Sequence, residues 1–284
     1  MQISETSKQI LAELLKSQTG QDFPTNRIWR VGTALSGLSR EHGIANLDRL
    51  IAKLALSHRS ALAEALLNNE TYFFRDRAMF ELLDERVLPE LARERASARS
   101  LRIWSVGCST GQEVLSLAML FAEQESRWAG WKVDILGTDV SSAAIEAARA
   151  ACYTPFQIQR GLAVGQMVKW FEETPQGWRA QDKLRRMVRF ERHNLLDPLP
   201  CQGGFDIVLC RNVLLYFDDA TRKCAFERLS AAIAPDGWLM LGAGETSIGQ
   251  TGRIVPDRTL RGLHRLSSFA AAQRQDEAPR RAAG

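Results

Sequence analysis

The chain has 284 residues, of which 45% are hydrophobic and 25% are charged, and its formal net charge is +4. This composition is typical of a globular protein with one large domain or two domains of ordinary size. No stretch approaches 18 uninterrupted apolar residues, and the first twenty residues lack the basic start and apolar core of a signal peptide. We therefore expect a cytoplasmic protein that does not insert into membranes.

The five cysteines and four histidines are scattered, without the spacing of a metal site or a disulfide framework. We expect reduced thiols and no bound metal. The net charge is too small to indicate nucleic acid, and we expect none as a partner. However, residues 156–193 carry eight Arg or Lys against four Asp or Glu, an excess equal to that of the whole chain. This basic segment is either a solvated surface or a docking site for an acidic partner.

The first part of the chain has a helical pattern. Apolar residues recur at helical spacing from Ile10 to Leu15, and a second helical stretch follows Asn46, which is a suitable N-cap. No run in this part is typical of a buried strand. We predict a small all-helical N-terminal domain over residues 1–75 and a linker helix over residues 76–100.

After residue 100, short apolar runs punctuated by Gly and Asp replace the helical pattern. Strands that alternate with helices indicate a parallel sheet, so the predicted fold class is α/β with a Rossmann-like domain over residues 101–268. An inserted subdomain at about 156–190 interrupts the alternation, and residues 269–284 are expected to be disordered. The predicted strands cover residues 101–107, 132–139, 187–194, 205–210 and 237–244, and the helices between them residues 112–125, 141–152 and 220–233.

Ligands of open α/β sheets bind beyond the carboxyl ends of the strands. After the first predicted strand, Gly107 and Gly111 allow a tight turn with close approach of the backbone to a ligand. The second strand ends at Asp139, which could accept both hydroxyls of a ribose or could instead cap the next helix. The third strand ends near Asn194 and Leu195, which could meet an adenine ring.

Arg211 and Asn212 interrupt the apolar run of residues 206–218. An unpaired charge in a core is costly. We therefore expect both residues to lie where the strand opens into the ligand cleft, and we expect Arg211 to face that cleft without forming a buried ion pair. The glycine turn has no Lys or Arg to hold a phosphate, and Asp139 follows it at more than the dinucleotide spacing. The pattern favours S-adenosylmethionine, with Glu113 placed for its ammonium group.

These stretches together resemble the chemotaxis-receptor glutamate methyltransferases, the CheR family. The similarity runs from about residue 5 to 268, and the pair T-x-F-F-R-D and C-R-N-x-x-x-Y-F is its most specific part. The matching stretches are NNETYFFRDRAMFELL, IWSVGCSTGQEVLSLAML, ILGTDVSSAAIEAARAACY, NLLD, FDIVLCRNVLLYFD and APDGWLMLGAGE. The resemblance implies methyl transfer from S-adenosylmethionine to glutamate side chains of chemoreceptors, which yields glutamate methyl esters and S-adenosylhomocysteine.

The resemblance also implies site residues. Arg75, Arg211 and Tyr216 match catalytic positions, with Tyr216 near the transferred methyl group, whereas Phe73 and Phe74 are expected to be packing residues. With Gly107 from the glycine turn, the expected cofactor-binding residues are Asn69, Thr71, Arg75, Glu113, Asp139, Asn194, Leu195, Arg211 and Asn212.

The family further implies an inserted β-subdomain and, as partner, the cytoplasmic helical domain of chemoreceptors. Some members grip a pentapeptide at the receptor's C-terminus through a glycine-rich turn in this subdomain. Here the turn has only Gly177 and is about three residues shorter by our alignment, so we expect a monomer that does not depend on the pentapeptide. Two alternatives stay open, namely a methyltransferase of another substrate and a catalytically weak cofactor-binding regulator.

Overall fold

The computed structural model describes residues 3–23, 25–200 and 204–272. Residues 267–272 are helical, so the predicted disordered tail begins with four helical residues, and the rest of that prediction lies outside the described residues. Within the described ranges, no helix is both long enough and apolar enough to cross a membrane.

The N-terminal part is helical and has its own apolar core, built around Leu11, Leu35 and Leu50, none of which is exposed. Asn46 is the N-cap of α4 as predicted, because its side chain accepts the backbone N–H of Arg49 at 2.9 Å. The elements of this part are α1 (Glu5–Thr19), the 3₁₀ helix η1 (Thr25–Arg30), α2 (Val31–Ala34), α3 (Ser36–His42), α4 (Leu47–Ser57) and α5 (Arg59–Leu66).

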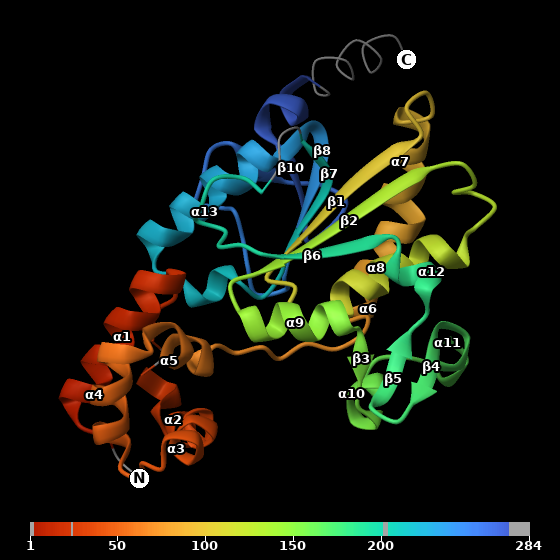
Figure 1. Cartoon of the computed structure of the whole chain (residues 1–284). Helices are drawn as coiled ribbons and strands as arrows, with labels where there is room; N and C mark the ends of the chain where they lie inside the picture. The colour runs from red at the N-terminus through yellow and green to blue at the C-terminus, as the bar shows by residue number, and fades with distance from the viewer. Residues whose placement is uncertain (1–2, 24, 201–203, 273–284) are drawn as a thin grey trace.

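A helical segment joins this part to a large sheet (Figure 1). It runs as α6 (Arg77–Leu82), a π-helical turn η2 (Leu83–Val87) and α7 (Leu88–Glu94). Before it, residues 67–76 cross from α5 to α6 below the strands of the sheet in Figure 1, in extended and turn conformations. Phe73 and Phe74 anchor this crossing segment, since both side chains are buried in the apolar core. Their predicted packing role is confirmed.

The sheet has seven strands in the order β6-β2-β1-β7-β8-β10-β9. The first five strands of this order pair in parallel, and β10 pairs antiparallel with β8 and β9. The predicted α/β class and its five strands are confirmed, whereas β9 and β10 are short strands that the apolar pattern did not predict. The bounds are β1 (Ser100–Val106), β2 (Lys132–Asp139), β6 (Val188–Arg192), β7 (Phe205–Cys210), β8 (Ile233–Leu241), β9 (Ile254–Pro256) and β10 (Leu263–Leu266).

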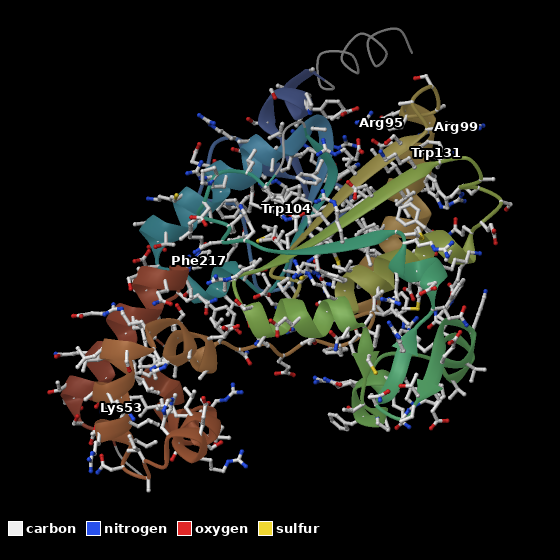
Figure 2. All side chains as sticks on the ribbon, viewed as in Figure 1. Lys53, Arg95, Arg99, Trp104, Trp131 and Phe217 are labelled. Carbon is white, nitrogen blue, oxygen red and sulfur yellow. The ribbon has the colours of Figure 1, made fainter. Side chains whose placement is uncertain are left out.

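Both faces of the sheet are covered, which is why β7 is buried at every residue. Neighbouring residues of a strand point to opposite faces. Ile103 of β1 belongs to the core under α8, whereas Trp104 belongs to the core under α13 and lies near the centre of the domain (Figure 2). The helices that cover the sheet include α7, α8 (Gln112–Glu123), α9 (Ser142–Ala150) and α13 (Asp219–Ala232).

A small three-stranded antiparallel sheet lies between α9 and β6 in the chain and hangs below the main sheet in Figure 1. Its strand order is β3-β5-β4, so β4 is an edge strand. Its apolar side chains, including Tyr153 and Phe171, pack against Phe73 of the crossing segment. The elements are β3 (Cys152–Tyr153), α10 (Pro155–Gln159), α11 (Val164–Trp170), β4 (Phe171–Thr174), β5 (Gly177–Ala180) and α12 (Asp182–Arg185).

Candidate active site

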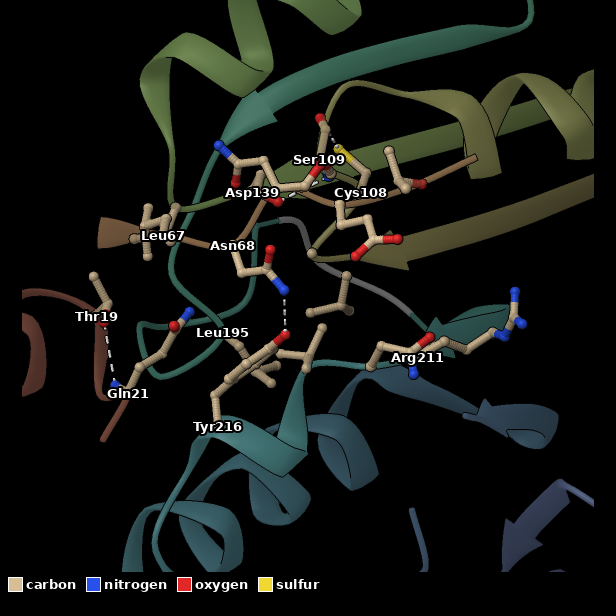
Figure 3. A pocket seen from close by; sticks show the side chains of 18 of the residues that line it. Thr19, Gln21, Leu67, Asn68, Cys108, Ser109, Asp139, Leu195, Arg211 and Tyr216 are labelled. Atoms are coloured by element: carbon tan, nitrogen blue, oxygen red, sulfur yellow. Dashed lines mark hydrogen bonds between the residues drawn. The ribbon is translucent and has the colours of Figure 1, made fainter. Parts of the chain in front are cut away.

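A cleft of about 1000 Å³, counted out to its open mouth, lies at the carboxyl ends of the parallel strands (Figure 3). The strand register aligns these ends, because Val106 of β1 pairs with both Thr138 and Cys210. The residues after β1, β2, β6 and β7 therefore meet at one edge. The cleft therefore lies where open α/β sheets bind their ligands.

All eleven residues predicted for the site line this cleft, and their individual roles remain predictions. Other lining residues, which the sequence did not indicate, come from the end of α1, the crossing segment, the glycine turn and the end of β6. The predicted group comprises Asn69, Thr71, Arg75, Gly107, Glu113, Asp139, Asn194, Leu195, Arg211, Asn212 and Tyr216, and the missed residues include Thr19, Gln21, Asn68, Ser109 and His193.

The turn after β1 depends on glycine. Gly107 has a φ of +67°, and a Cβ added there would lie 2.4 Å from Cγ2 of Val213. A side chain at this position would therefore displace the loop that follows β7. The turn is tied to the sheet because the N–H of Cys108 donates to the carbonyl of Thr138 at 2.9 Å. The turn thus brings its backbone to the cleft and feeds directly into α8.

Asp139 is nearly buried, with 8% of its surface exposed, and both of its carboxylate oxygens accept backbone N–H groups. One oxygen accepts from Ser109 at 2.8 Å and the other from Ser141 at 2.9 Å. Burial raises the pKa of Asp139, although these hydrogen bonds oppose the shift. The helix-cap alternative is wrong, because the N-cap of α9 is Ser141, whose hydroxyl accepts the N–H of Ala144. Each carboxylate oxygen retains capacity to accept a further hydrogen bond.

Arg211 forms a buried ion pair, and our expectation that it would not do so is wrong. Its side chain is only 1% exposed, and it pairs with Asp76 at 2.5 Å and with Glu113 at 2.9 Å. It also donates to the backbone carbonyl of Arg75 at 2.7 Å. The sequence could not show this, because both partners are distant along the chain: Asp76 reaches Arg211 from the end of the crossing segment, and Glu113 reaches it from the start of α8. Arg211 therefore joins the crossing segment to the strand ends.

Tyr216 lies on a short 3₁₀ turn, η3 (Leu214–Tyr216), with its hydroxyl at the cleft. The side-chain amide of Asn68 donates to this hydroxyl at 2.8 Å (Figure 3). The loop before Tyr216 has Asn212 at a φ of +60°. The carboxylate of Glu245 stabilises this loop, because it accepts the backbone N–H groups of three consecutive residues, 212–214.

The sequence did not predict this role of Glu245. The sequence feature that could have indicated this role is a single carboxylate in a glycine-containing turn at the end of β8, next to the loop that it stabilises.

The helical domain contributes to the wall of the cleft. The side-chain amide of Asn194 donates to the carbonyl of Gln18, at the end of α1, at 3.3 Å. The backbone N–H of Asp22 donates to the carbonyl of Tyr216 at 2.7 Å. Beside these contacts, Lys16 pairs with Asp218 at 2.6 Å. The end of α1 is therefore fixed to both loops that border the cleft.

Residues 69–255 match the model of a protein family described as "CheR methyltransferase, SAM binding domain". The chain belongs to the CheR methyltransferase family. A chemotaxis protein methyltransferase of Vibrio parahaemolyticus is 33% identical over 259 residues, which cover 89% of this chain and 93% of the relative. Chemotaxis protein methyltransferase 1 of Pseudomonas aeruginosa is 34% identical over 252 residues, covering 86% of this chain and 92% of the relative. This CheR protein is an S-adenosylmethionine-dependent methyltransferase.

The cleft of this CheR protein fits its cofactor, S-adenosylmethionine. Asp139 presents a nearly buried carboxylate with free acceptor capacity, as a ribose diol requires. Glu113 is a second acid in the cleft, and an acid is a suitable partner for the ammonium group that S-adenosylmethionine carries at its amino-acid end. Leu195 adds an apolar surface beyond β6 for a flat ring. In the described part of the chain, no group of three or more His, Cys, Asp or Glu is arranged to hold a metal ion.

Proposed function

We propose that this protein methylates the side-chain carboxylate of glutamate residues in the cytoplasmic helical domain of chemoreceptors. The observation that carries the proposal is the placement of Arg75 and Tyr216 in one cleft with Asp139, in a chain that aligns with chemotaxis protein methyltransferases over nearly 90% of its length. The products are a glutamate methyl ester and S-adenosylhomocysteine.

The chemistry suits the residues of the cleft. When bound, S-adenosylmethionine supplies a methyl group on a sulfonium, and an ionised carboxylate can attack that group directly. An unperturbed glutamate has a pKa of about 4.3 and is already ionised at neutral pH, so the reaction needs no general base. The protein must hold the carboxylate in line with the methyl group and exclude water. Such positioning can lower a barrier by up to about 7–11 kcal/mol.

Each role follows from a position in the cleft. Asp139 accepts the two hydroxyls of the ribose, and the backbone after Gly107 lies against the cofactor. Glu113 binds the ammonium group. Its carboxylate oxygens already accept hydrogen bonds from Ser105 and Arg211, and each oxygen can accept one more. Since the guanidinium of Arg211 is enclosed by its ion pairs, we assign steering of the acceptor carboxylate to Arg75 and a positioning role to Arg211.

The charge distribution supports an acidic partner. Arg179, Lys183 and Arg186 lie on exposed parts of the inserted segment, and Lys183 pairs with Glu125 at the surface. Exposed charges attract an acidic helix over a distance comparable to the Debye length, so the interaction is sensitive to salt. We propose that the protein works as a monomer and docks on the receptor through such charges.

Transfer of labelled methyl groups tests the proposal. The purified protein is incubated with labelled S-adenosylmethionine and membranes that contain chemoreceptors, and the products are then treated with mild base. A glutamate methyl ester releases volatile labelled methanol, whereas N-methyl and ether products do not. Label that resists base would indicate another substrate. Cofactor binding without any transfer would indicate a regulator.

A further inference from the structure

The mouth of the cleft carries a cluster of charged side chains from distant parts of the chain. Glu70 lines the cleft, and 54% of its side chain is exposed. Arg160 follows α10 in the inserted segment, and its Nη2 donates to Oε1 of Glu70 at 2.7 Å. The carboxylate at the mouth is therefore held by a guanidinium from a distant part of the chain.

Tyr72 holds two guanidinium groups beside this carboxylate. The guanidinium carbon of Arg160 lies 4.4 Å from the centroid of the Tyr72 ring, and that of Arg75 lies 5.7 Å from the same centroid. Both distances are within the range of cation–π attraction. Arg75 also donates to the backbone carbonyl of Glu70 at 3.2 Å. The ring thus keeps Arg75 and Arg160 close to Glu70.

The cluster already binds a glutamate side chain in its ionised form. The hydrogen bond from Arg160 lowers the pKa of Glu70 against its partial burial, and the charges of Arg160, Arg75 and Arg30 act in the same direction. Glu70 is therefore a carboxylate at neutral pH. Because Glu70 lines the cleft and half of its side chain is exposed, a glutamate side chain that enters the cleft can reach the same guanidinium groups.

We propose that Arg160, Tyr72 and Arg75 form the recognition site for the acceptor carboxylate, and that Glu70 fills this site until the acceptor arrives. The inference rests on the proposed function, since it assumes a glutamate acceptor. Arg160 and Glu70 are both about half exposed, and an exposed pair of this kind is weak enough to open easily. An incoming glutamate replaces one carboxylate with another, so the charge and the hydrogen bonds of Arg160 are conserved. The exchange selects carboxylates without burying the nucleophile in a tight ion pair.

Two substitutions test whether Glu70 competes with the acceptor carboxylate and whether Arg160 binds it. The probe is the cytoplasmic fragment of a chemoreceptor from the same genome. Its KM is measured at saturating S-adenosylmethionine, and its Kd is measured by fluorescence anisotropy with S-adenosylhomocysteine present. Glu70→Gln removes the competing carboxylate and should lower both constants about three- to fivefold. Arg160→Gln should raise both about five- to tenfold, with kcat changed less than about twofold, and the double variant should resemble Arg160→Gln.

The exposed pair Arg253–Glu227, at 3.2 Å and outside the inserted segment, provides matched controls. Glu227→Gln and Arg253→Gln make the same changes of charge away from the cleft, and neither should shift KM or Kd. Equal shifts in these controls would reduce the effect to general electrostatics and overturn the inference. A Glu70→Gln variant whose binding of the receptor fragment is unchanged or weaker would also overturn the inference.

The outcomes also separate this inference from the proposed function. If wild-type protein forms no base-labile methyl ester on the fragment, the proposed function fails. If it forms the ester and Glu70→Gln does not tighten binding, only the recognition site fails. Thermal melts check folding, and Arg160→Lys, which keeps the charge but loses the planar fork, should give an intermediate KM. Should Arg160→Gln not fold, Glu70→Gln decides the question.

Discussion

Arg211 shows how a single side chain can connect the site to the fold. Its guanidinium is enclosed by Asp76, Glu113 and a backbone carbonyl, and water hardly reaches it. Removing one partner of a buried ion pair leaves the other charges unpaired. We therefore expect Arg211→Ala to lower the free energy of unfolding by about 3–5 kcal/mol, measured by urea denaturation.

Arg75→Ala is the matched control, because it removes the same charge from a neighbouring but more accessible position. It should change the free energy of unfolding by no more than about 1 kcal/mol while it lowers the methylation rate. If Arg211→Ala proves as stable as the wild type, the buried ion pair does not support the fold.

Asp139 should dominate the affinity for the cofactor. Asp139→Ala removes the acceptor that we propose for both ribose hydroxyls, so we expect the loss of two charge-assisted hydrogen bonds to weaken cofactor binding by about 2 kcal/mol or more in isothermal calorimetry. The same substitution frees the N–H groups of Ser109 and Ser141, so stability should also fall. Asp139→Asn keeps an acceptor and should weaken binding less. Wild-type affinity in the Ala variant would remove Asp139 from the ribose site.

At the scale of residues, the sequence predicted which side chains would gather but not how they pair. The polar residues at strand ends were identifiable because parallel strands bring their carboxyl ends to one edge. The pairing of Arg211 with Asp76 depends on how the crossing segment packs, which no local pattern encodes. Asn68 and Ser109 were missed for the same reason, since each reaches the cleft through the path of its backbone.

The helical domain stabilises the cleft by capping a helix of the methyltransferase domain. Glu64 of α5 accepts the hydroxyl of Ser141 at 2.8 Å and the N–H of Ala143 at 2.7 Å, at the N-terminus of α9. A carboxylate is favourable there because it satisfies free N–H groups and complements the helix dipole. We expect Glu64→Ala to lower the free energy of unfolding by about 1 kcal/mol and to weaken cofactor binding, because Ser141 supports Asp139.

Urea denaturation and calorimetry measure these two effects. Glu146→Ala, on an exposed position of the same helix, should change neither. A loss of stability in Glu64→Ala without loss of affinity would show that capping does not reach the ribose site.

The contact between α1 and α13 should depend on pH. The hydrogen bond from Lys16 holds the pKa of Asp218 well below its usual range. Burial opposes the charge of Lys16, but its hydrogen bonds to Asp218 and Asp22 outweigh burial and raise its pKa. Because the pKa of Asp218 is lower in the folded state, its ionised carboxylate stabilises the fold above about pH 4. This contribution is lost as the pH falls and Asp218 is protonated. Because the pKa of Lys16 is higher in the folded state, its ammonium group stabilises the fold until it loses its proton above about pH 10.

We therefore expect wild-type protein to have a higher urea midpoint than Lys16→Met between about pH 5 and 10, and the difference to disappear at lower pH. Lys53→Met, on an exposed face of α4, is the control for loss of a lysine. A difference between wild type and Lys16→Met that persists at pH 3 would assign the effect to packing instead of charge.

At the scale of elements, periodicity predicted the helical domain and the alternation of strands and helices, because each element buries an apolar face of fixed period. It could not predict β9 and β10, which have three and four residues and are too short for a period to show. Nor could it predict that Glu64 caps α9, since that contact follows from the docking of two domains.

The whole molecule presents two routes to a receptor, its basic inserted segment and an edge strand in the small sheet. The edge strand, β4, has four residues, and β5 follows it after a short turn. In antiparallel pairing only alternate residues direct both backbone groups to the free edge, so about two residues of β4 could hold an added peptide. That is little backbone for a stable tether, whereas the basic side chains act at a distance and over a broad surface.

We therefore expect a receptor that lacks its C-terminal pentapeptide to be methylated at the same rate as the full-length receptor. Since we propose that exposed charges guide docking, the rate at subsaturating receptor should fall several-fold between about 50 and 500 mM salt, where the Debye length shrinks to a few ångströms. Initial rates with both receptor forms across this range measure both effects, and the affinity for the cofactor should stay constant as a control. Micromolar binding of the isolated pentapeptide, lost when residues 171–180 are altered, would show that the edge strand is the tether.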